Sequence, residues 1–400
     1  MNRLRLAIIS THPIQYYAPV FRALADDPRI ELRVFYTMSQ VADSPVSDAG
    51  FGRDIRWDIP LQEGYDSEFV PNVAHTPGTA HFKGIHNPAL IPTIEKWRPG
   101  AVLVYGWNHR SHLAALHHFK GRVPVFFRGD STLLDERPSW RKLARRAVLR
   151  WIYSHIDVAI AVGSNNRDYF AWCGVPAERI AFAPHSVDNE RFADRSGVHR
   201  AHAAQLRSEL GLAPWDRVIV FAGKFMPYKD PLLLLESFIR VDADAHLVLV
   251  GNGVLESEMR LRAQDYSNIH FLPFQNQSAM PAVYRLGEVF ILPSRSETWG
   301  LALNEAMASG RPIIAGSKVG AARDLVREGV NGWQFESRNG AHLTSVLRQA
   351  IKADRRTLAS MGELNAKVID AWSTPAAALG IADAVTTFAC APSYASVLLS

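Results

Sequence analysis

Two glutamates in the second half of the chain, Glu297 and Glu305, are predicted to lie where a strand, a loop and a helix follow one another. A buried strand is predicted to end at Pro293, and residues 301–308 have the composition of a helix that ends before Gly310. Glu297 then lies in the loop and Glu305 one turn into the helix, on the same side. One carboxylate could hold sugar hydroxyls and the other the hydroxyls of a ribose. A phosphate could bind the free amides where the helix starts, near Trp299, Gly300 and Leu301.

Two lysines follow an earlier predicted strand, at residues 218–222. Gly223 lets the backbone turn closely where the strand ends, and Lys224 and Lys229 occupy the loop beyond it. Two ammonium groups in that place suit a diphosphate, because they neutralise the charge that grows when a phosphate leaves. Taken alone, the same loop could be an ordinary solvated one.

The turn Gly251-Asn252-Gly253 lacks the third glycine of a dinucleotide-binding fingerprint. No such fingerprint follows the first predicted strand either, which argues against a nicotinamide or flavin oxidoreductase. A tight turn with positive φ is sufficient to explain both glycines.

In the first half of the chain, His12 and Asp130 each follow a predicted strand. Either could orient a sugar or handle the proton of an acceptor hydroxyl, although Asp130 could equally be a turn residue that caps the next segment. The histidines at 109, 112, 117 and 118 lack the full spacing of a metal site, so no metal is expected. The pair Asp242 and Asp244 imitates a metal-binding motif but precedes a strand, so a turn is expected there.

Strands and helices alternate along the chain, which is typical of parallel α/β units. Strands are predicted at residues 6–10, 32–36, 101–105, 123–127 and 158–162, and then at 218–222, 246–250, 269–272, 289–292 and 312–315. The fold class expected is α/β, with two doubly wound Rossmann-like domains facing each other across a cleft. Their predicted bounds are 1–190 and 191–373, and residues 374–400 are expected to form a helix that crosses back to the first domain, with a tail. Since ligands gather at the carboxyl ends of parallel strands, the cleft is the expected substrate site.

The second half, from about residue 157 to residue 372, resembles the retaining nucleotide-sugar glycosyltransferases of glycosyltransferase family 4, which have the GT-B fold. The specific element is the Glu-x7-Glu motif from Glu297 to Glu305, followed by Ala-Met-Ala-Ser-Gly-Arg-Pro. The family's Gly-Arg-x4-Lys is met by Gly223, Lys224 and Lys229. A lysine replaces the usual arginine there, which weakens a bidentate grip but keeps the charge.

The resemblance implies a role for each matched residue. Lys224 and Lys229 would bind the donor diphosphate, Glu305 the ribose hydroxyls and Glu297 the transferred sugar. The catalytic residues expected are Glu297, Lys224, Lys229, Asp130 and His12. The donor contacts expected are Gly223, Lys224, Lys229, Glu297, Thr298, Trp299, Gly300, Leu301 and Glu305.

The chain also departs from the family pattern. Asp324 stands where the family often has Glu, and His185 replaces the Asn of its inter-domain Pro-Asn-Gly-Val-Asp. Many members have a Gly-Gly loop after the first strand, whereas residues 10–17 here are rich in hydrogen-bonding and aromatic side chains. Asp130 stands where the family often has a histidine. The role of the loop at 10–17 is therefore left open.

The composition excludes several other classes of protein. Apolar residues make up 48% and charged residues 21% of the 400, so a folded, soluble protein of two or three domains is expected. No apolar run approaches the ~20 residues of a membrane span, and no signal peptide is expected. Cys173 and Cys390 form no Cys-x-x-Cys motif, which fits a reducing cytoplasm. The net charge of +5 does not indicate a nucleic-acid partner.

Residues 139–152 are predicted to form a basic helix, with Ser139 as a possible cap. An apolar stripe and a basic face are expected on opposite sides: Trp140, Leu143, Ala147 and Trp151 against Arg141, Lys142, Arg145 and Arg146. Such a helix could lie on an anionic membrane surface or a lipid-phosphate acceptor, on the inner face of the plasma membrane. Alternatively, the stripe is ordinary core beneath a solvated basic face.

These observations lead to one main expectation and two alternatives. As the resemblance implies, the expected activity is metal-independent, retaining transfer of a sugar from a nucleoside-diphosphate sugar, which is the donor substrate, to an acceptor hydroxyl. No other cofactor is expected. The resemblance implies a sugar, oligosaccharide or lipid-linked acceptor in the synthesis of cell-surface polysaccharide, lipopolysaccharide or glycolipid. The alternatives are a catalytically inactive sugar-nucleotide-binding protein and a GT-B epimerase or phosphorylase, although no epimerase-like acid pair or pyridoxal-lysine site is visible.

Overall fold

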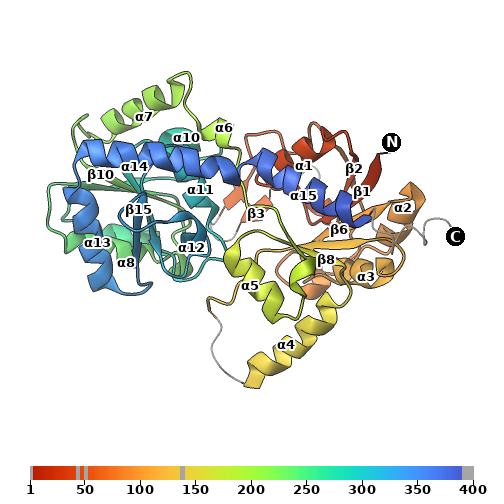
Figure 1. Cartoon of the computed structure of the whole chain (residues 1–400). Coiled ribbons are helices and arrows are strands. Elements are labelled where there is room, and N and C mark those ends of the chain that lie inside the picture. Colours follow the sequence, from red (N-terminus) through yellow and green to blue (C-terminus); the bar gives the residue numbers. More distant parts are fainter. Residues whose placement is uncertain (1–2, 42–45, 49–52, 136–139, 390–400) are drawn as a thin grey trace. The chain divides into compact units, whose positions relative to one another are not determined.

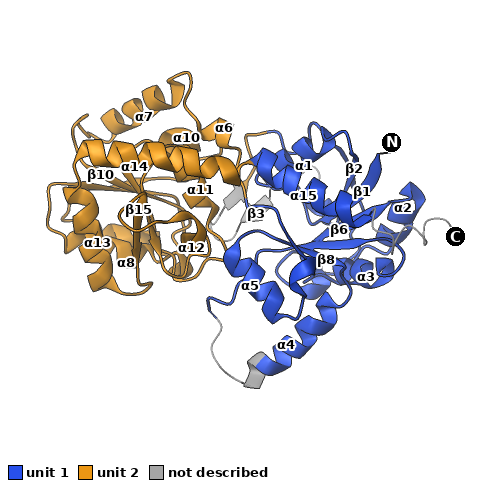
Figure 2. Cartoon of the chain, in the orientation of Figure 1, with its two compact units in different colours: residues 1–45, 60–185, 374–400 blue, residues 46–59, 186–373 orange. Residues whose placement is uncertain are grey.

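Apolar runs rich in β-branched residues form two separate parallel sheets, one in each half of the chain (Figure 1). The computed structural model describes residues 3–41, 46–48, 53–135 and 140–389. The chain divides into two compact units (Figure 2). Unit 1 comprises residues 1–45, 60–185 and 374–400, and unit 2 comprises residues 46–59 and 186–373. The predicted fold class of two doubly wound, Rossmann-like domains is confirmed.

The sheet of unit 1 has seven parallel strands in the order β5-β2-β1-β6-β7-β8-β9. Their bounds are β1 (Leu4–Ser10), β2 (Ile30–Tyr36), β5 (Asp66–Phe69), β6 (Ala101–Tyr105), β7 (Val125–Arg128), β8 (Val158–Ala161) and β9 (Ile180–Phe182). The helices are α1 (Ala18–Ala25), α2 (Leu90–Trp97), α3 (Arg110–Phe119), α4 (Trp140–Tyr153), α5 (Ser164–Trp172) and α15 (Thr374–Ala389), with short 3-10 turns η1 (Ser39–Val41), η2 (Phe82–Gly84) and η3 (Ala177–Arg179).

Helices cover both faces of this sheet, because the side chains of a buried strand point alternately to either side. Leu6 and Ile8 of β1 pack with α1 and α15, whereas Ala7 and Ile9 pack with the helices from α2 to α5. The last helix is therefore part of the core of unit 1. Gly380 allows α15 to approach β9 closely, since a Cβ there would lie 2.6 Å from the carbonyl oxygen of Phe182.

The sheet of unit 2 has six parallel strands in the order β12-β11-β10-β13-β14-β15. Their bounds are β10 (Val218–Ala222), β11 (His246–Val250), β12 (Ile269–Leu272), β13 (Val289–Leu292), β14 (Ile313–Gly316) and β15 (Gly332–Phe335). The other elements are β3 (Val46–Asp48), β4 (Arg53–Ile55), α6 (Asn189–Phe192), α7 (Val198–Glu209), η4 (Pro227–Lys229), α8 (Pro231–Ile239), α9 (Glu256–Ala263), α10 (Met280–Tyr284), α11 (Leu301–Ala308), α12 (Ala322–Leu325), α13 (Gly340–Lys352), α14 (Arg355–Val368) and η5 (Ile369–Trp372).

Two boundaries of the units differ from the predicted bounds of 1–190 and 191–373. The chain leaves unit 1 between His185 and Ser186. Residues 46–59, which lie far from the rest of unit 2 in the sequence, join it through the loop before α10. There Asn276 donates a hydrogen bond to the Arg56 carbonyl (2.8 Å) and the Ser278 amide donates to Asp58 (3.1 Å).

Helix α4 presents its predicted apolar stripe to solvent. Leu143 is 68% exposed and Trp151 is 54% exposed, while Leu149, Ile152 and Tyr153 face the core of unit 1. The alternative of a core stripe beneath a solvated basic face is therefore wrong for Leu143 and Trp151. Residue Ser139 and the side chains of Trp140, Arg141 and Lys142 lie outside the described residues.

Candidate functional site

The candidate site of unit 2 lies where the strand order of its sheet reverses. Strand β10 pairs with β11 on one side and with β13 on the other, and all three are parallel. Their carboxyl ends therefore meet at one edge, with the reversal between β10 and β13. Open α/β sheets bind ligands outside such a switch point. The loops at 223–230 and 293–300 follow these two strands.

Lys229 and Glu297 form an ion pair across the switch point. Lys229 Nζ lies 2.5 Å from Glu297 Oε2, and the two side chains are 17% and 20% exposed. Ser294 Oγ donates a second hydrogen bond to the same carboxylate oxygen, at 3.0 Å. The lysine predicted to bind a diphosphate and the glutamate predicted to bind a sugar are thus brought together by neighbouring loops.

A second ion pair joins the same two loops. Arg295 donates to Asp230 Oδ1 at 2.8 Å, and the backbone amide of Arg295 donates to the Tyr228 carbonyl, also at 2.8 Å. The Asp230 carboxylate hydrogen-bonded to Arg295 raises the pKa of that guanidinium. Asp230 is buried and has a φ of +54°, a conformation that a non-glycine residue adopts at a cost. Sequence reasoning missed this pair, although Asp230 directly follows Lys229.

The loop that carries Lys224 is packed against the turn after β11. Gly251 has a φ of +140°, and a Cβ there would lie only 2.0 Å from the carbonyl oxygen of Gly223. Hydrogen bonds join the two loops, from the Gly223 amide to the Val250 carbonyl and from the Phe225 amide to the Asn252 carbonyl, each 2.9 Å long. The positive φ predicted for this turn is confirmed. The close approach of the two loops requires a glycine at position 251, in the turn after β11. Gly223, in the loop after β10, has no positive φ.

The loop after β13 is held by the loop after β14. The Glu297 amide donates to the Lys318 carbonyl (3.1 Å), and the Gly320 amide donates to the Glu297 carbonyl (3.0 Å). A Cβ at Gly320 would lie 1.9 Å from the carbonyl oxygen of Thr298, so only glycine fits there. Gly300, with a φ of +101°, then turns the chain into α11, whose first residue is Leu301.

Glu305 lies on α11 and is 3% exposed. Its Oε2 accepts a hydrogen bond from the hydroxyl of Tyr284, at the end of α10. The Tyr284 ring packs against Phe192 and Phe290, with ring centroids 5.8 and 5.0 Å away. Tyr284 is therefore fixed in place and fixes one oxygen of Glu305. Sequence reasoning missed Tyr284, since nothing in its local pattern distinguishes it from a core aromatic residue.

The loop residue Trp299 is also fixed by packing. Its indole Nε1 donates to Asn304 Oδ1 at 2.9 Å, and its ring stacks on Trp372 with centroids 4.9 Å apart.

All of the predicted donor-contact residues lie on the loops after β10 and β13 or on α11.

The two candidate residues of the first half belong to unit 1. His12 follows β1, its Nδ1 lies 3.0 Å from Thr11 Oγ1, and burial lowers its pKa. Asp130 follows β7, and its charge adds to burial in raising the pKa of Tyr17. Strand β6 separates β1 from β7 in the sheet, so the two residues follow strands that are not neighbours.

His185, the departure at the family's inter-domain motif, is buried beside Arg128 at the same edge of unit 1. Arg128 donates to the carbonyls of Ala183 (2.9 Å) and Pro184 (3.0 Å), which fixes the segment before His185. Burial, and then the charge of Arg128, lowers the pKa of His185 to about 3. The ring of Tyr17 stacks on His185 with centroids 6.3 Å apart. The aromatic loop at 10–17 thus contributes to the packing of this edge.

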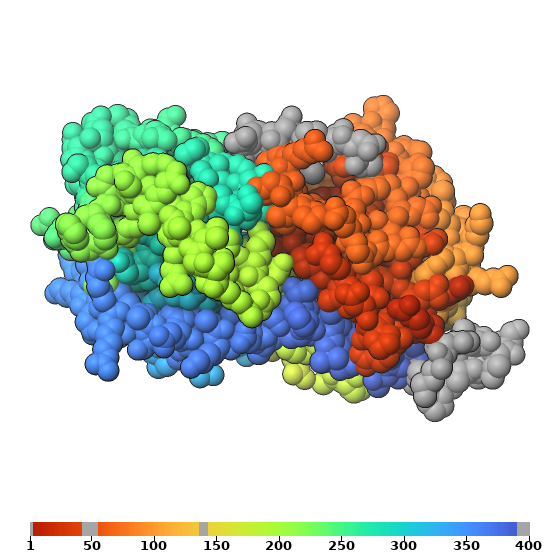
Figure 3. Space-filling view, turned by 90° about the horizontal axis from the view of Figure 1, so that it is seen from above, coloured from red at the N-terminus to blue at the C-terminus, as the bar shows by residue number. Residues whose placement is uncertain are grey.

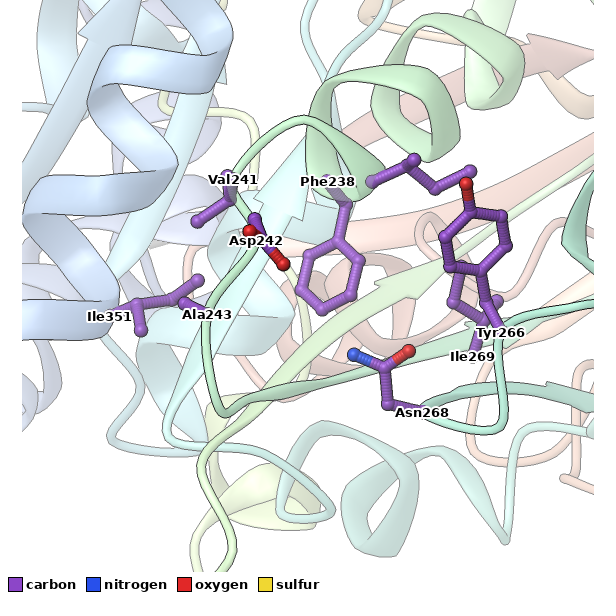
Figure 4. Close-up of a pocket in the computed structure, with 9 residues that line it drawn as sticks. Phe238, Val241, Asp242, Ala243, Tyr266, Asn268, Ile269 and Ile351 are labelled. Atoms are coloured by element: carbon purple, nitrogen blue, oxygen red, sulfur yellow. The ribbon is translucent and has the colours of Figure 1, made fainter.

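Two pockets of unit 2 lie at the opposite, amino edge of its sheet. One, of about 140 Å³, is lined by Phe238, Tyr266 and Asn268 just before β11 and β12 (Figure 4). The other, of about 460 Å³, lies beside α7. Among the described residues, no group of three or more His, Cys, Asp or Glu side chains is arranged to hold a metal ion.

Comparison with known proteins identifies the family. A model of glycosyl transferases group 1 matches residues 203–368, and a model of the glycosyl transferase 4-like domain matches residues 67–185. A D-inositol 3-phosphate glycosyltransferase of Nocardia farcinica is 32% identical over 388 residues, which cover 90% of this chain and 84% of the relative. One of Geodermatophilus obscurus is 27% identical over 363 residues, 85% of this chain and 74% of the relative. The chain belongs to glycosyltransferase family 4.

The fold agrees with this assignment. A crystal structure of Anabaena HepE in complex with UDP and glucose superposes with a TM-score of 0.68 at 17% identity, covering 96% of this chain and all of that chain. At that identity the likeness shows the fold, which is GT-B. The class of protein is thus a GT-B glycosyltransferase.

Proposed function

We propose that the protein is a retaining glycosyltransferase that moves a sugar from a nucleoside-diphosphate-sugar donor to an acceptor hydroxyl. The observation that carries the proposal is the pair of Lys229 and Glu297 at the switch point, 2.5 Å apart, beside the start of α11. A lysine suits the diphosphate and a carboxylate suits sugar hydroxyls. Family membership supports transfer as the class of reaction.

In this proposal the positive groups stabilise the leaving diphosphate. Lys224, Lys229 and the backbone amides at the start of α11 surround the diphosphate, whose negative charge grows as the glycosidic bond breaks. Glu297 gives up part of its contact with Lys229 and accepts hydrogen bonds from the transferred sugar. Glu305, with one oxygen held by Tyr284, binds the ribose hydroxyls.

The configuration at the anomeric carbon is retained if the acceptor attacks from the same face of the sugar from which the diphosphate departs. The C–O bond to the leaving phosphate breaks, the acceptor oxygen bonds to the anomeric carbon, and the departing phosphate oxygen takes the acceptor proton. His12 and Asp130 are proposed to orient the acceptor hydroxyl. Because lysines and amides supply the positive charge, the reaction is proposed to need no metal.

Thermal unfolding with a panel of nucleoside diphosphates and their sugars tests the donor site. A ligand that binds only the folded protein raises the midpoint of unfolding, and the rise should be lost in Lys229→Ala and Glu305→Ala. UDP and UDP-glucose come first in the panel, since HepE was solved with UDP and glucose. No stabilisation by any nucleotide would contradict the proposal.

Product analysis then separates the alternatives. Slow release of nucleoside diphosphate without acceptor, abolished in Glu297→Ala and unchanged by EDTA, supports metal-independent transfer. Binding without turnover favours the inactive binding protein, and inversion of the sugar with the nucleotide retained favours an epimerase.

The acceptor is proposed to be lipid-linked and presented at an anionic membrane surface, to which α4 binds from the cytoplasmic side. Among the described residues no helix has the length and apolar character of a membrane span. At 100° per residue, Leu143, Ala147 and Trp151 lie on one side of α4, opposite Leu149 and Ile152, which face the core. Arg150 is exposed on one flank of the outward stripe, beside Leu143, whereas the exposed Arg145 lies on the opposite side of the helix. An apolar ridge with an arginine beside it suits the interface of an anionic bilayer.

Sedimentation with vesicles tests this part of the proposal. Leu143→Ser with Trp151→Ser should weaken binding to vesicles that contain phosphatidylglycerol, and leave donor hydrolysis unchanged. The matched control is Leu261→Ser on α9, where Leu261 is 65% exposed. Arg150→Glu is the charge test, because Arg150 is exposed beside the stripe, whereas Arg146 donates to the Trp172 carbonyl and supports the fold. Equal binding by all variants would remove the membrane proposal.

A phosphorylated polyol is the second candidate acceptor. The relatives in Nocardia and Geodermatophilus are named D-inositol 3-phosphate glycosyltransferases. Transfer assays with inositol 3-phosphate and with polyprenyl-phosphate-linked sugars distinguish the two. Transfer to inositol 3-phosphate, together with no binding to vesicles, would replace the lipid-linked acceptor.

A further inference from the structure

Four arginines of unit 2 gather around the pocket beside α7. The pocket has a volume of about 460 Å³, within the range of small-molecule sites. Figure 3 shows the yellow-green α7 at the surface, with a hollow next to it. The guanidinium groups that line it come from separate parts of the sequence: Arg200, Arg207, Arg285 and Arg311.

The backbone orients three of these guanidinium groups. Arg207 donates to the carbonyls of Leu286, Ala213 and Asp216 (2.7–2.9 Å). Arg285 donates to Pro281 and Phe192, and Arg311 donates to Ser309 and Gly287 (both 3.2 Å). Because carbonyl oxygens carry no net charge, these bonds orient the groups without neutralising them.

Carboxylates only partly balance this charge. Asp194 lies 3.1 Å from Arg200 and 3.8 Å from Arg285, and the charge of Glu288 acts on Arg311. Four positive groups thus face two negative ones. Burial, and then repulsion by Arg311, lowers the pKa of Arg285 to about 10. An added anion would relieve this repulsion.

The rest of the lining is apolar. Leu212, Pro214 and Ala203 line the pocket between the arginines. Arg285 and Arg311 precede β13 and β14, so the pocket lies at the amino edge of the sheet. Lys229 and Glu297 follow strands at the carboxyl edge, which makes this a separate site.

We propose that the pocket binds a small metabolite with a phosphoryl group, held by the guanidinium groups of Arg200, Arg285 and Arg311, with its carbon body against Leu212 and Pro214. Guanidinium groups match the geometry of phosphate oxygens and form strong charge-assisted hydrogen bonds with them. The exposed side chain of Arg200, at the mouth of the pocket, closes over the ligand.

Calorimetric titration with glycerol 3-phosphate and with inorganic phosphate tests the proposal. Ala204→Trp fills the pocket from an exposed position of α7 without removing a charge, and Arg200→Glu reverses the charge at its mouth. Arg200→Glu should weaken binding of glycerol 3-phosphate by about tenfold or more, the value of one charge-assisted hydrogen bond. Ala204→Trp should weaken it because the indole occupies the space of the ligand. The matched control is Ala201→Trp, at an exposed position of α7 that does not line the pocket. It should bind as the wild type does.

The donor site could also bind phosphate, and Lys229→Ala separates the two sites. Binding should persist in Lys229→Ala if the arginine pocket is the site. Loss of binding in Lys229→Ala with retention in Ala204→Trp and Arg200→Glu would overturn the proposal and support the donor site instead. Glycerol should not bind, and sodium chloride at equal ionic strength should not reproduce the phosphate effect. Absence of binding to the wild type would also overturn the proposal.

Discussion

Lys229 and Glu297 neutralise each other across the switch point of unit 2. They are 68 positions apart in the sequence, yet the lysine Nζ lies 2.5 Å from the glutamate Oε2. The pair of Arg295 and Asp230 holds the same two loops together beside it. In the proposed function a diphosphate takes over the contact with Lys229, and neutral sugar hydroxyls donate hydrogen bonds to the Glu297 carboxylate. The proposed donor, a diphosphate joined to a sugar, would use both members of the pair at once.

A double-mutant cycle on this pair is the first test. Lys229→Met and Glu297→Gln should each lower kcat/KM for sugar transfer by about 10²–10³-fold, the usual loss when a group that stabilises transition-state charge is removed. Because the two side chains act on the same donor, the double variant should lose much less than the product of the single losses. Steady-state kinetics with saturating acceptor measures this.

The control for that cycle is Lys352→Met in the last turn of α13, which also removes one lysine from unit 2. It should leave kcat/KM unchanged. Fully multiplicative losses would mean that Lys229 and Glu297 act independently, and would contradict their joint role.

Tyr284→Phe tests how Glu305 is positioned. Without the Tyr284 hydroxyl, the buried Glu305 carboxylate loses a donor, which should destabilise the protein by about 1–3 kcal/mol. UDP should bind more weakly, because the carboxylate oxygen proposed to meet the ribose is no longer fixed. Pyrophosphate, which has no ribose, should bind as before. Equal weakening of UDP and pyrophosphate would point to a general loss of fold instead.

Most of the sheet framework could be predicted from the sequence, because buried parallel strands are continuous apolar runs. All ten predicted strands are present, and β10 and β11 have the predicted bounds. The strands that were missed are β3 and β4, which pair with each other in a two-stranded sheet, and β5, β9 and β15, which lie at the edges of the two large sheets. Strand β5 carries polar side chains at Asp66 and Glu68, so it lacks an apolar signal. Strands β9 and β15 have only 3 and 4 residues, too few to show a pattern.

The candidate site was predictable only where its residues carry a recognisable spacing. Lys229 and Glu297 could be named from the Gly-x5-Lys and Glu-x7-Glu patterns. Tyr284 and Asp230 could not, because their importance arises from contacts between loops that are distant in the sequence. The exposure of Leu143 and Trp151 on α4 was equally hidden. Periodicity shows that a helix has an apolar stripe but does not show which side of the helix meets the core.

His112 makes stability depend on pH. It is fully buried, Nε2 lies 2.9 Å from Thr37 Oγ1, and burial lowers its pKa from 6.5 to about 4. Between these values the unfolded chain binds the proton and the folded protein does not, so stability falls as pH falls from 7 to 4 and then levels off. The total contribution is about 3 kcal/mol. In His112→Gln the fall in unfolding midpoint between pH 7 and pH 5 should shrink. The matched control is His75→Gln, which replaces an exposed histidine and should keep the full fall.

Gly251→Ala tests whether the turn after β11 positions the loop of Lys224. The added methyl group would lie 2.0 Å from the Gly223 carbonyl oxygen, and the φ of +140° is unfavourable for alanine. The backbone from Gly223 to Lys229 must therefore move away from β11. We expect a lower unfolding midpoint and a loss of nucleotide binding larger than the loss of stability explains. Gly329→Ala is the comparison: its φ of +68° is also positive, although alanine costs less there than at +140°, and a Cβ there meets nothing within 4 Å. If both variants lower stability and only Gly251→Ala weakens nucleotide binding, close packing of the two loops positions the site. Equal binding by both variants would show that the loop of Lys224 can shift without harm to the site.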